Sequence, residues 1–186
     1  MNLVQPIRER EKLEDLKEEL KKKGLRDYML FLTGSNSGMR VSDIINLNVN
    51  DVRNKDGTMK SHIIVIEKKT KKTKKFPLCN DLFKEMEKYT KNMKEGEYLF
   101  KSRNGENKPI TTTQAYRIIK RASNSLGLEE VGTHTMRKSF GYHHYQQYKD
   151  VALLQEIFNH SSPSITLKYI GINQDNIDLG YRDFSI

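Results

Sequence analysis

Residues 132–141 read GTHTMRKSFG, and the rest of the chain can be interpreted outward from this stretch. Gly132 and Thr133 predict a turn and a helix N-cap, because a threonine hydroxyl can accept from the first free N–H groups of a helix. His134 and Arg137 then lie in the first helical turn, three residues apart and on one face. A helix N-terminus favours an anion, so a forked arginine and a histidine placed there predict a phosphate site. Taken alone, this spacing more often marks a capping or packing histidine and an arginine that pairs with a surface acid.

Composition limits the class of protein. A chain of 186 residues that is 35% hydrophobic and 31% charged suits one soluble globular domain. No apolar run approaches membrane-spanning length, and the first residues lack a signal-peptide core, so we expect a cytoplasmic protein without membrane contact. One cysteine, Cys79, excludes an internal disulfide and a cysteine-based zinc site. The formal net charge of +9 favours a polyanionic partner.

The N-terminal third is predicted to be helical. Residues 1–7 are expected to form an arm, and residues 8 to about 23 a surface helix with one buried leucine stripe. Residues 25–36 predict a buried helix. The stretch SGMRVSDIINL follows, in which we expect Ser42 to cap a short helix and Arg40 to lie in the preceding turn. A single loop arginine is by itself more often an ordinary surface residue.

Residues 61–78 alternate and are rich in β-branched side chains, which predicts a β-hairpin. Its tip, EKKTKKTKK, carries six lysines in nine residues. A lysine run is usually a solvated tip, but in so basic a chain it also suits contact with phosphates. We therefore expect DNA contacts from three of these side chains, Lys68, Lys71 and Lys72.

The remainder is predicted to be mainly helical. Helices are expected at 80–93, at 112 to about 125 behind a Thr111 capping box, at 134 to about 148, at 151–158, and after the Ser162-Pro163 start signal. A short strand is expected at 98–100, and one more short helix in the tail at 173–186. Basic residues that line part of one helix are further candidate DNA contacts: Arg117, Lys120 and Arg121. Asn159 is expected to end a helix in the left-handed conformation.

Six residues form a set that suits attack on a phosphodiester without a metal: Arg40, Lys69, His134, Arg137, His160 and Tyr169. A tyrosine supplies an oxygen nucleophile, and two arginines neutralise the transition state. Histidine and lysine handle protons. No cluster of acidic residues in the sequence suggests a magnesium site.

With these residues in place, the sequence resembles the tyrosine recombinase (phage integrase) family. The matching stretches are SGMRVSDIINL, KKTKKTKKFPL, HTMRKSFG and NHSSPSITLKYIG, in the family's order and over residues from about 8 to about 176. The resemblance implies a mainly α fold with a small antiparallel β-sheet (α+β), the tyrosine recombinase catalytic-domain fold.

The resemblance also implies roles. Arg40 and Arg137 would bind the phosphate, His134 would handle a proton, His160 would contact the phosphate, and Tyr169 would be the nucleophile. Asp43 matches an acidic position that supports the site. The family's general acid is a hairpin lysine, and eight residues before Pro77 gives Lys69, with the adjacent lysines 68, 71 and 72 as alternatives.

By the same resemblance, the chain would cleave and rejoin DNA through a 3′-phosphotyrosyl link, without metal or cofactor, as a homotetramer on double-stranded DNA from a mobile element. A type IB topoisomerase or resolvase, and a non-catalytic DNA-binding module of the same fold, are the alternatives. Two departures from the family's pattern are expected: Asn159 takes the place of a glycine, and residues 1–186 would lack the family's N-terminal core-binding domain. We expect a single catalytic domain over 1–186, either an excised fragment or a natural single-domain protein.

Overall fold

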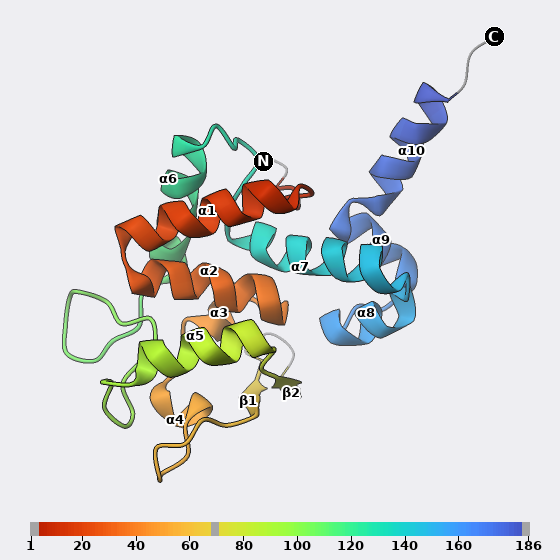
Figure 1. The fold of residues 1–186 in the computed structure, drawn as a ribbon. Coiled ribbons are helices and arrows are strands. Elements are labelled where there is room, and N and C mark those ends of the chain that lie inside the picture. Colours follow the sequence, from red (N-terminus) through yellow and green to blue (C-terminus); the bar gives the residue numbers. More distant parts are fainter. Residues whose placement is uncertain (1–3, 68–70, 184–186) are drawn as a thin grey trace.

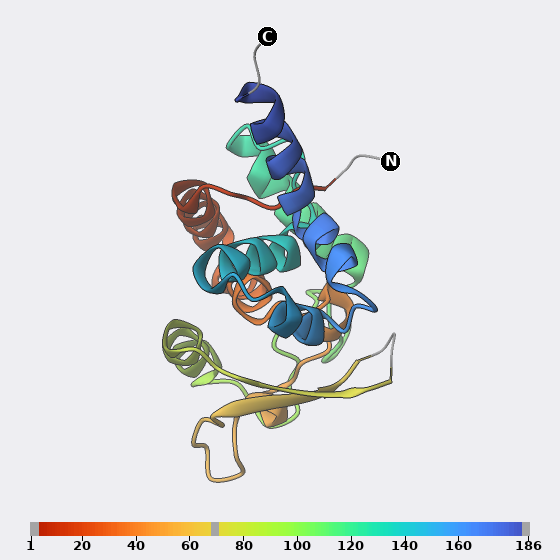
Figure 2. The ribbon, with the colours of Figure 1, turned by 90° about the vertical axis from the view of Figure 1, so that its right-hand side faces the viewer.

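The computed structural model describes residues 4–67 and 71–183, which form helices with one antiparallel hairpin at the edge of the helical part (Figures 1 and 2). The elements in chain order are α1 (Arg10–Lys23), α2 (Leu25–Ser37), α3 (Val41–Ile44), α4 (Val49–Val52), β1 (His62–Ile66), β2 (Thr73–Pro77), α5 (Asn80–Thr90), α6 (Thr112–Ser125), α7 (Thr133–Tyr148), α8 (Val151–Phe158), α9 (Pro163–Ile170) and α10 (Ile172–Arg182). The predicted mainly α fold with a small antiparallel sheet is confirmed.

The main core is built around α2, which contacts α1, α5, α6 and α7 (Figure 1). Its central residues, from Tyr28 to Gly34, are all buried, as expected for a helix that is apolar on every side. From α1 only one stripe is buried, with Leu16 and Leu20 fully covered. The predicted leucine stripe is therefore confirmed.

A second, smaller apolar cluster lies where α7, α8 and α9 meet. Leu154, Phe158, Ile170 and Ile172 are its buried members, with α7 aromatic side chains packed on them. The helix α10 projects away from this cluster (Figures 1 and 2). The N-terminal segment is tied down beside it, because Arg8 pairs with Asp175 at 2.7 Å.

The hairpin pairs Ile63 with Phe76, and both side chains are buried against the core. Because alternate residues face the same side, Lys74 shares this inner face, whereas Lys75 lies on the outer one. Glu67 closes the ladder by donating its N–H to the carbonyl of Lys72. Figure 2 shows the hairpin extending beneath α8. Lys68 and Lys69, two of the residues predicted to act on DNA, lie outside the described residues.

Several expected boundaries are wrong by a few residues. Arg40 rather than Ser42 precedes the short helix α3, and Gly132 rather than Thr133 is the N-cap of α7. Gly132 has no side chain that could cap the helix, and the hydroxyl of Thr135, inside the helix, instead accepts the N–H of Gly132. The helix α5 ends at Thr90 instead of residue 93.

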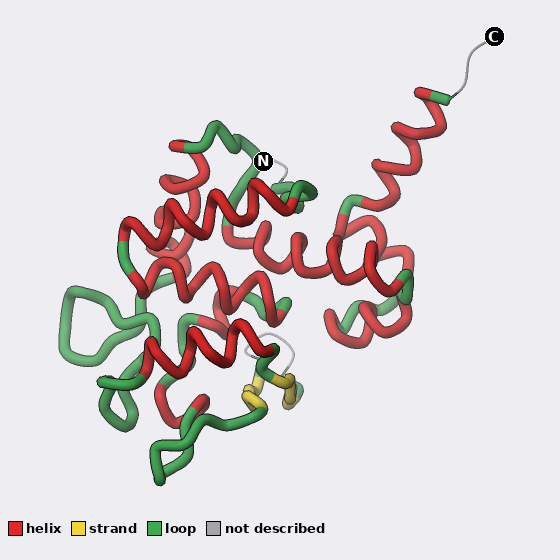
Figure 3. The backbone as a smooth tube through the Cα atoms, in the orientation of Figure 1, coloured by secondary structure: helices red, strands yellow, loops and turns green. Residues whose placement is uncertain are grey.

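The strand expected at 98–100 is not formed. Tyr98 makes one isolated bridge with Asn48, and the segment between α5 and α6 is loop (Figure 3). Leu99 and Phe100 are nevertheless fully buried. Burial in the core therefore explains their apolar character.

Candidate active site

Five of the six residues predicted to carry the chemistry line one cavity of about 380 Å³. They come from four separate places: Arg40 before α3, His134 and Arg137 in the first turn of α7, His160 after α8, and Tyr169 in α9. Asn159, Ser161 and Ile165 complete the described lining. The sixth residue, Lys69, is outside the part of the chain that the structure describes. We call this cavity the phosphate pocket, after the ligand that the sequence predicts for it.

Arg137 is held by the ends of two helices. Its Nη2 donates to the carbonyl of Phe158 at 2.8 Å, at the end of α8, and its Nη1 donates to the carbonyl of Gly38, just after α2. Helix C-termini carry partial negative charge, which favours a cation there. The guanidinium also lies over the Phe158 ring, 4.2 Å from its centroid, and the residue is only 3% exposed. These contacts fix the guanidinium before any ligand arrives.

Gly38 is required for this arrangement on two grounds. Its φ of 61° is in the left-handed region, which side chains rarely adopt. A Cβ at this position would lie 2.6 Å from a ring carbon of Phe140. The absence of a side chain therefore lets the Gly38 carbonyl come close to Arg137.

Arg40 is held by an acid from the hairpin. Its Nη1 donates to Oε1 of Glu67 at 2.7 Å, and the Glu67 side chain is almost completely buried. Because Glu67 also closes the β-ladder, the backbone of the hairpin and the guanidinium of Arg40 are mechanically linked. Sequence reasoning missed this contact, since Glu67 looked like the first residue of a solvated tip.

His160 and Tyr169 lie edge to face, with ring centroids 5.2 Å apart. The buried hydroxyl of Thr166 is 3.0 Å from Nδ1 of His160 and holds the imidazole in place. Burial raises the pKa of Tyr169, while the charges of Arg137 and Arg40 oppose that rise. Burial lowers the pKa of His160, and the same arginines lower it further. A protonated phenol and a neutral imidazole beside two arginines suit an anionic ligand.

Lys74 is a residue near the pocket that sequence reasoning did not single out. Its Nζ donates to the carbonyl of Ile157 at 2.7 Å, one residue before the carbonyl that holds Arg137. Burial lowers the pKa of Lys74 to about 8, and repulsion from Arg137 contributes. The available signal was period-2 alternation, because Lys74 lies two residues before the buried Phe76.

The predicted DNA contacts are dispersed. Lys72 donates to Oδ1 of Asn159 at 2.8 Å and so touches the lining of the phosphate pocket. Lys71 is exposed in the hairpin turn with a φ of 59°. Lys120 donates to the carbonyl of Glu129. Arg117 and Arg121 line a different cavity, on α6.

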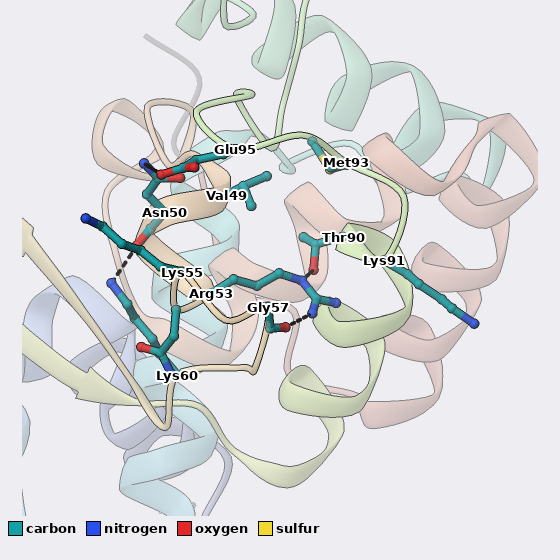
Figure 4. Close-up of a pocket in the computed structure, with 11 residues that line it drawn as sticks. Val49, Asn50, Arg53, Lys55, Gly57, Lys60, Thr90, Lys91, Met93 and Glu95 are labelled. Atoms are coloured by element: carbon teal, nitrogen blue, oxygen red, sulfur yellow. Dashed lines mark hydrogen bonds between the residues drawn. The ribbon is translucent and has the colours of Figure 1, made fainter.

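A larger cavity of about 510 Å³ lies between α4, the 53–60 turn and α5 (Figure 4). Its lining is rich in basic residues, but the hydrogen bonds of its arginine join parts of the fold. Arg53 donates through Nε to the Thr90 hydroxyl at 2.8 Å, through Nη2 to the Glu87 carbonyl at 2.7 Å, and through Nη1 to the Gly57 carbonyl. The residues described as lining this cavity include no histidine and no tyrosine. Size alone therefore does not identify the site.

Residues 4–67 and 71–183 lack two further kinds of feature. Within these ranges, no group of three or more histidine, cysteine, aspartate or glutamate side chains could hold a metal ion. Within the same ranges, no helix has the length and apolar character needed to cross a membrane.

Known proteins share this fold. The crystal structure of XerA recombinase superposes with a TM-score of 0.75 at 21% identity, covering 97% of this chain and 65% of that one. The XerH site-specific recombinase, solved bound to its difH substrate in a pre-cleavage complex, gives a TM-score of 0.69 at 23% identity over 91% of this chain and 51% of that one.

Proteins with similar sequences belong to the same group of recombinases. The probable integrase/recombinase YoeC of Bacillus subtilis (strain 168) is 53% identical over 184 residues, which are 99% of this chain and 98% of that protein. Tyrosine recombinase XerA of Pyrococcus horikoshii is 31% identical over 82% of this chain, which spans about half (53%) of XerA. Residues 8–175 match the profile of the phage integrase family. The chain therefore belongs to the phage integrase family, the tyrosine recombinases.

Proposed function

We propose that this chain breaks and rejoins DNA strands, with Tyr169 as the nucleophile. The observation that carries the proposal is the phosphate pocket itself, in which two arginines, two histidines and a tyrosine from four chain segments line one cavity. Structural packing alone does not require such a set at one point. The net charge of +9 supports a polyanionic substrate.

The proposed step is an in-line displacement at phosphorus. The Tyr169 oxygen forms a bond to phosphorus, the bond to the 5′-oxygen breaks, and the phosphate stays attached as a 3′-phosphotyrosyl link. The phenolic proton would pass to a base, for which the two histidines of the same cavity, His134 and His160, are the candidates, and a hairpin lysine would protonate the departing 5′-oxygen. A 5′-hydroxyl of a partner strand reverses the reaction, so bond energy is conserved and no nucleotide cofactor is needed.

Arg40 and Arg137 would stabilise the charge on the non-bridging oxygens. Preorganised donors of this kind contribute roughly 10²–10³-fold in rate each. Arg137 in particular is fixed by two backbone carbonyls in the free chain, so its orientation costs little when substrate binds. We propose that these arginines take the place of a metal ion.

Double-stranded DNA is the proposed partner. XerH was solved with difH substrate, and a lambda integrase dimer was solved bound to a COC′ core site. By analogy, we propose that several copies of this chain assemble as a homotetramer on two DNA duplexes, in the cytoplasm, and that the duplexes include the DNA of a mobile element.

The experiment uses a nicked suicide duplex, which traps the covalent adduct on denaturing gels. The wild-type chain should form a protease-sensitive adduct in the presence of excess EDTA. Tyr169→Phe keeps the ring and its packing against Phe158 and His160 but removes the nucleophilic oxygen, so it should bind DNA and form no adduct. Tyr181→Phe is the control, because Tyr181 is 81% exposed on α10.

An adduct that survives Tyr169→Phe would refute the assigned nucleophile, and loss of the adduct in EDTA would refute the metal-free mechanism. Addition of an acceptor duplex with a free 5′-hydroxyl then separates the alternatives. Strand transfer between duplexes supports a recombinase, whereas resealing within one duplex supports a topoisomerase. A chain that binds DNA but never forms an adduct would be the non-catalytic module.

A further inference from the structure

The last turn of α8 receives cations from two different parts of the molecule. The carbonyl of Ile157 accepts from Lys74 of the hairpin, and the next carbonyl, that of Phe158, accepts from Arg137 of the phosphate pocket. Asn159, which follows in the left-handed conformation with a φ of 53°, accepts from Lys72 through its side chain. His160 comes directly after. The position of this turn therefore affects Arg137 and His160 together.

Lys74 occupies an energetically unfavourable place. The residue is partly buried, and repulsion from Arg137 and Arg40 is opposed by attraction to Glu67 and Asp43. Because a cation that loses part of its water is destabilised, burial alone does not explain a lysine here. What the lysine does provide is a directed hydrogen bond from the hairpin to the end of α8.

The hairpin is well suited to act as the fixed side of this contact. Its inner face begins with Ile63 and Phe76 in the core and becomes charged toward the tip. On that face Lys74 reaches α8, and Glu67, at the end of β1, reaches Arg40. Lys74 thus contacts the end of α8 next to the phosphate pocket, and Glu67 contacts Arg40, which lines the pocket.

We propose that Lys74 is a positioning residue, which fixes the last turn of α8 and through it the guanidinium of Arg137 and the ring of His160. Lys74 is not among the residues described as lining the phosphate pocket, so it would act through α8 and not on the substrate itself. This inference rests on the proposed function for its effect on rate, but its effect on the geometry of the free protein is independent of that function.

The test compares two adjacent lysines on opposite faces of one strand. Lys74→Met keeps a long flexible side chain and removes the hydrogen bond, whereas Lys75→Met alters the outward-facing neighbour. In single-turnover cleavage at saturating nicked DNA, Lys74→Met should be about 10- to 100-fold slower, because small misplacements of catalytic groups have effects of this size. Its DNA dissociation constant should stay within about threefold of the wild type. Lys74→Arg, which restores a cationic donor, should recover most of the rate.

Lys75→Met should show the opposite pattern. Its cleavage rate at saturating DNA should be unchanged, and its DNA binding should be weaker and less sensitive to salt. In the free protein, the NMR signals of the His160 ring and of the Arg137 Nε–H should shift in Lys74→Met and remain in place in Lys75→Met. The thermal midpoint of Lys74→Met should equal or exceed that of the wild type.

Equal rates for wild type and Lys74→Met, or unmoved His160 and Arg137 signals, would overturn the proposal. A lower thermal midpoint with a loss of rate that the arginine variant does not restore would overturn it too, since that result describes a general packing residue. If the wild type itself forms no adduct, the proposed function fails, and the NMR comparison still decides whether Lys74 positions the pocket.

Discussion

Two arginine side chains of this molecule make nearly the same hydrogen bonds to backbone carbonyls, but they lie in different surroundings. Arg53, at the large cavity, and Arg137, at the phosphate pocket, each donate Nη1 to the carbonyl of a glycine with positive φ, Gly57 and Gly38 respectively. Each also donates Nη2 to a second backbone carbonyl. The difference is that Nε of Arg53 is taken by Thr90, and the guanidinium joins the 53–60 turn to α5.

Arg137 is instead placed beside Arg40, His160 and Tyr169 in the smaller cavity. Its carbonyl partners belong to the ends of two helices, which hold the guanidinium without neutralising it. Neither cavity size nor the binding mode of an arginine therefore identifies a site. What identifies it is that histidine and tyrosine side chains gather beside an arginine whose charge is not neutralised. Matched substitutions in the two regions test this distinction.

The largest expected difference is between Arg137→Ala and Arg53→Ala. Removal of Arg137 should slow adduct formation by about 10³-fold or more, since a positioned arginine can be worth that much in phosphoryl transfer. Removal of Arg53 should leave the rate within a few-fold of the wild type and lower the free energy of unfolding by about 1–3 kcal/mol, because the buried Thr90 hydroxyl and the Glu87 carbonyl lose their donor. Single-turnover assays and urea denaturation measure the two quantities. Similar rate losses in both variants would contradict the distinction.

The next pair of substitutions is at Gly38 and Gly57, whose carbonyls accept from Arg137 and Arg53. Gly38→Ala forces a side chain into a left-handed conformation and against Phe140, so we expect a loss of about 2–4 kcal/mol in unfolding free energy and a slower cleavage step. Gly57→Ala meets no atom within 4 Å at its Cβ and should cost only about 1 kcal/mol of conformational strain. Thermal denaturation of the two variants decides the order. Equal losses would mean that the contact with Phe140 is relieved at little cost.

Much of this arrangement could be predicted from the sequence, for identifiable reasons. The capping box at Thr111, the left-handed Asn159 and the Ser162-Pro163 start are local signals, and each is present as expected. The gathering of Arg40, His134, Arg137, His160 and Tyr169 in one cavity was expected from the family resemblance, whose motifs carry long-range information.

What could not be predicted depends on contacts between distant segments. The pairing of Glu67 with Arg40 spans 27 residues, and that of Lys74 with Ile157 spans 83. In a run of six lysines and two threonines, composition does not say which side chain turns inward. The strand expected at 98–100 failed for a related reason, because buried apolar residues resemble a strand whether or not a partner strand is present.

Two buried threonines provide the third pair. Thr166→Val keeps the shape of the side chain and removes the hydroxyl that holds Nδ1 of His160, so we expect a roughly tenfold slower cleavage step, equivalent to about one hydrogen bond. Thr90→Val removes the hydroxyl that accepts from Arg53, and it should lower stability without changing the rate. A rate loss in Thr90→Val comparable with that in Thr166→Val would show that the two regions are coupled.

The smallest effect concerns the charge of His160. Burial, Arg137 and Arg40 all lower its pKa from the ordinary value, so the imidazole of the free protein should titrate below that value. Proton binding is then weaker in the folded state than in the unfolded chain. The resulting stability is present above the unfolded pKa near 6.5, and it is lost as the pH falls through the folded pKa. NMR titration of the His160 Cε1 proton measures this directly.

Matched arginine variants identify the source of that shift. Arg40→Gln removes a nearby cation and leaves the carboxylate of Glu67 without this ion-pair partner. Each effect stabilises the imidazolium, so the pKa of His160 should rise. Arg53→Gln removes an equal charge at the large cavity, where the arginine is not among the groups that shift His160, and it should leave the titration unchanged. If both variants move the pKa equally, the shift reflects the net charge of the whole chain. If only Arg40→Gln moves it, the arginines of the phosphate pocket create a local positive potential in the absence of DNA. A phosphate that binds there would then raise the pKa of His160 toward the range in which the imidazolium can donate a proton.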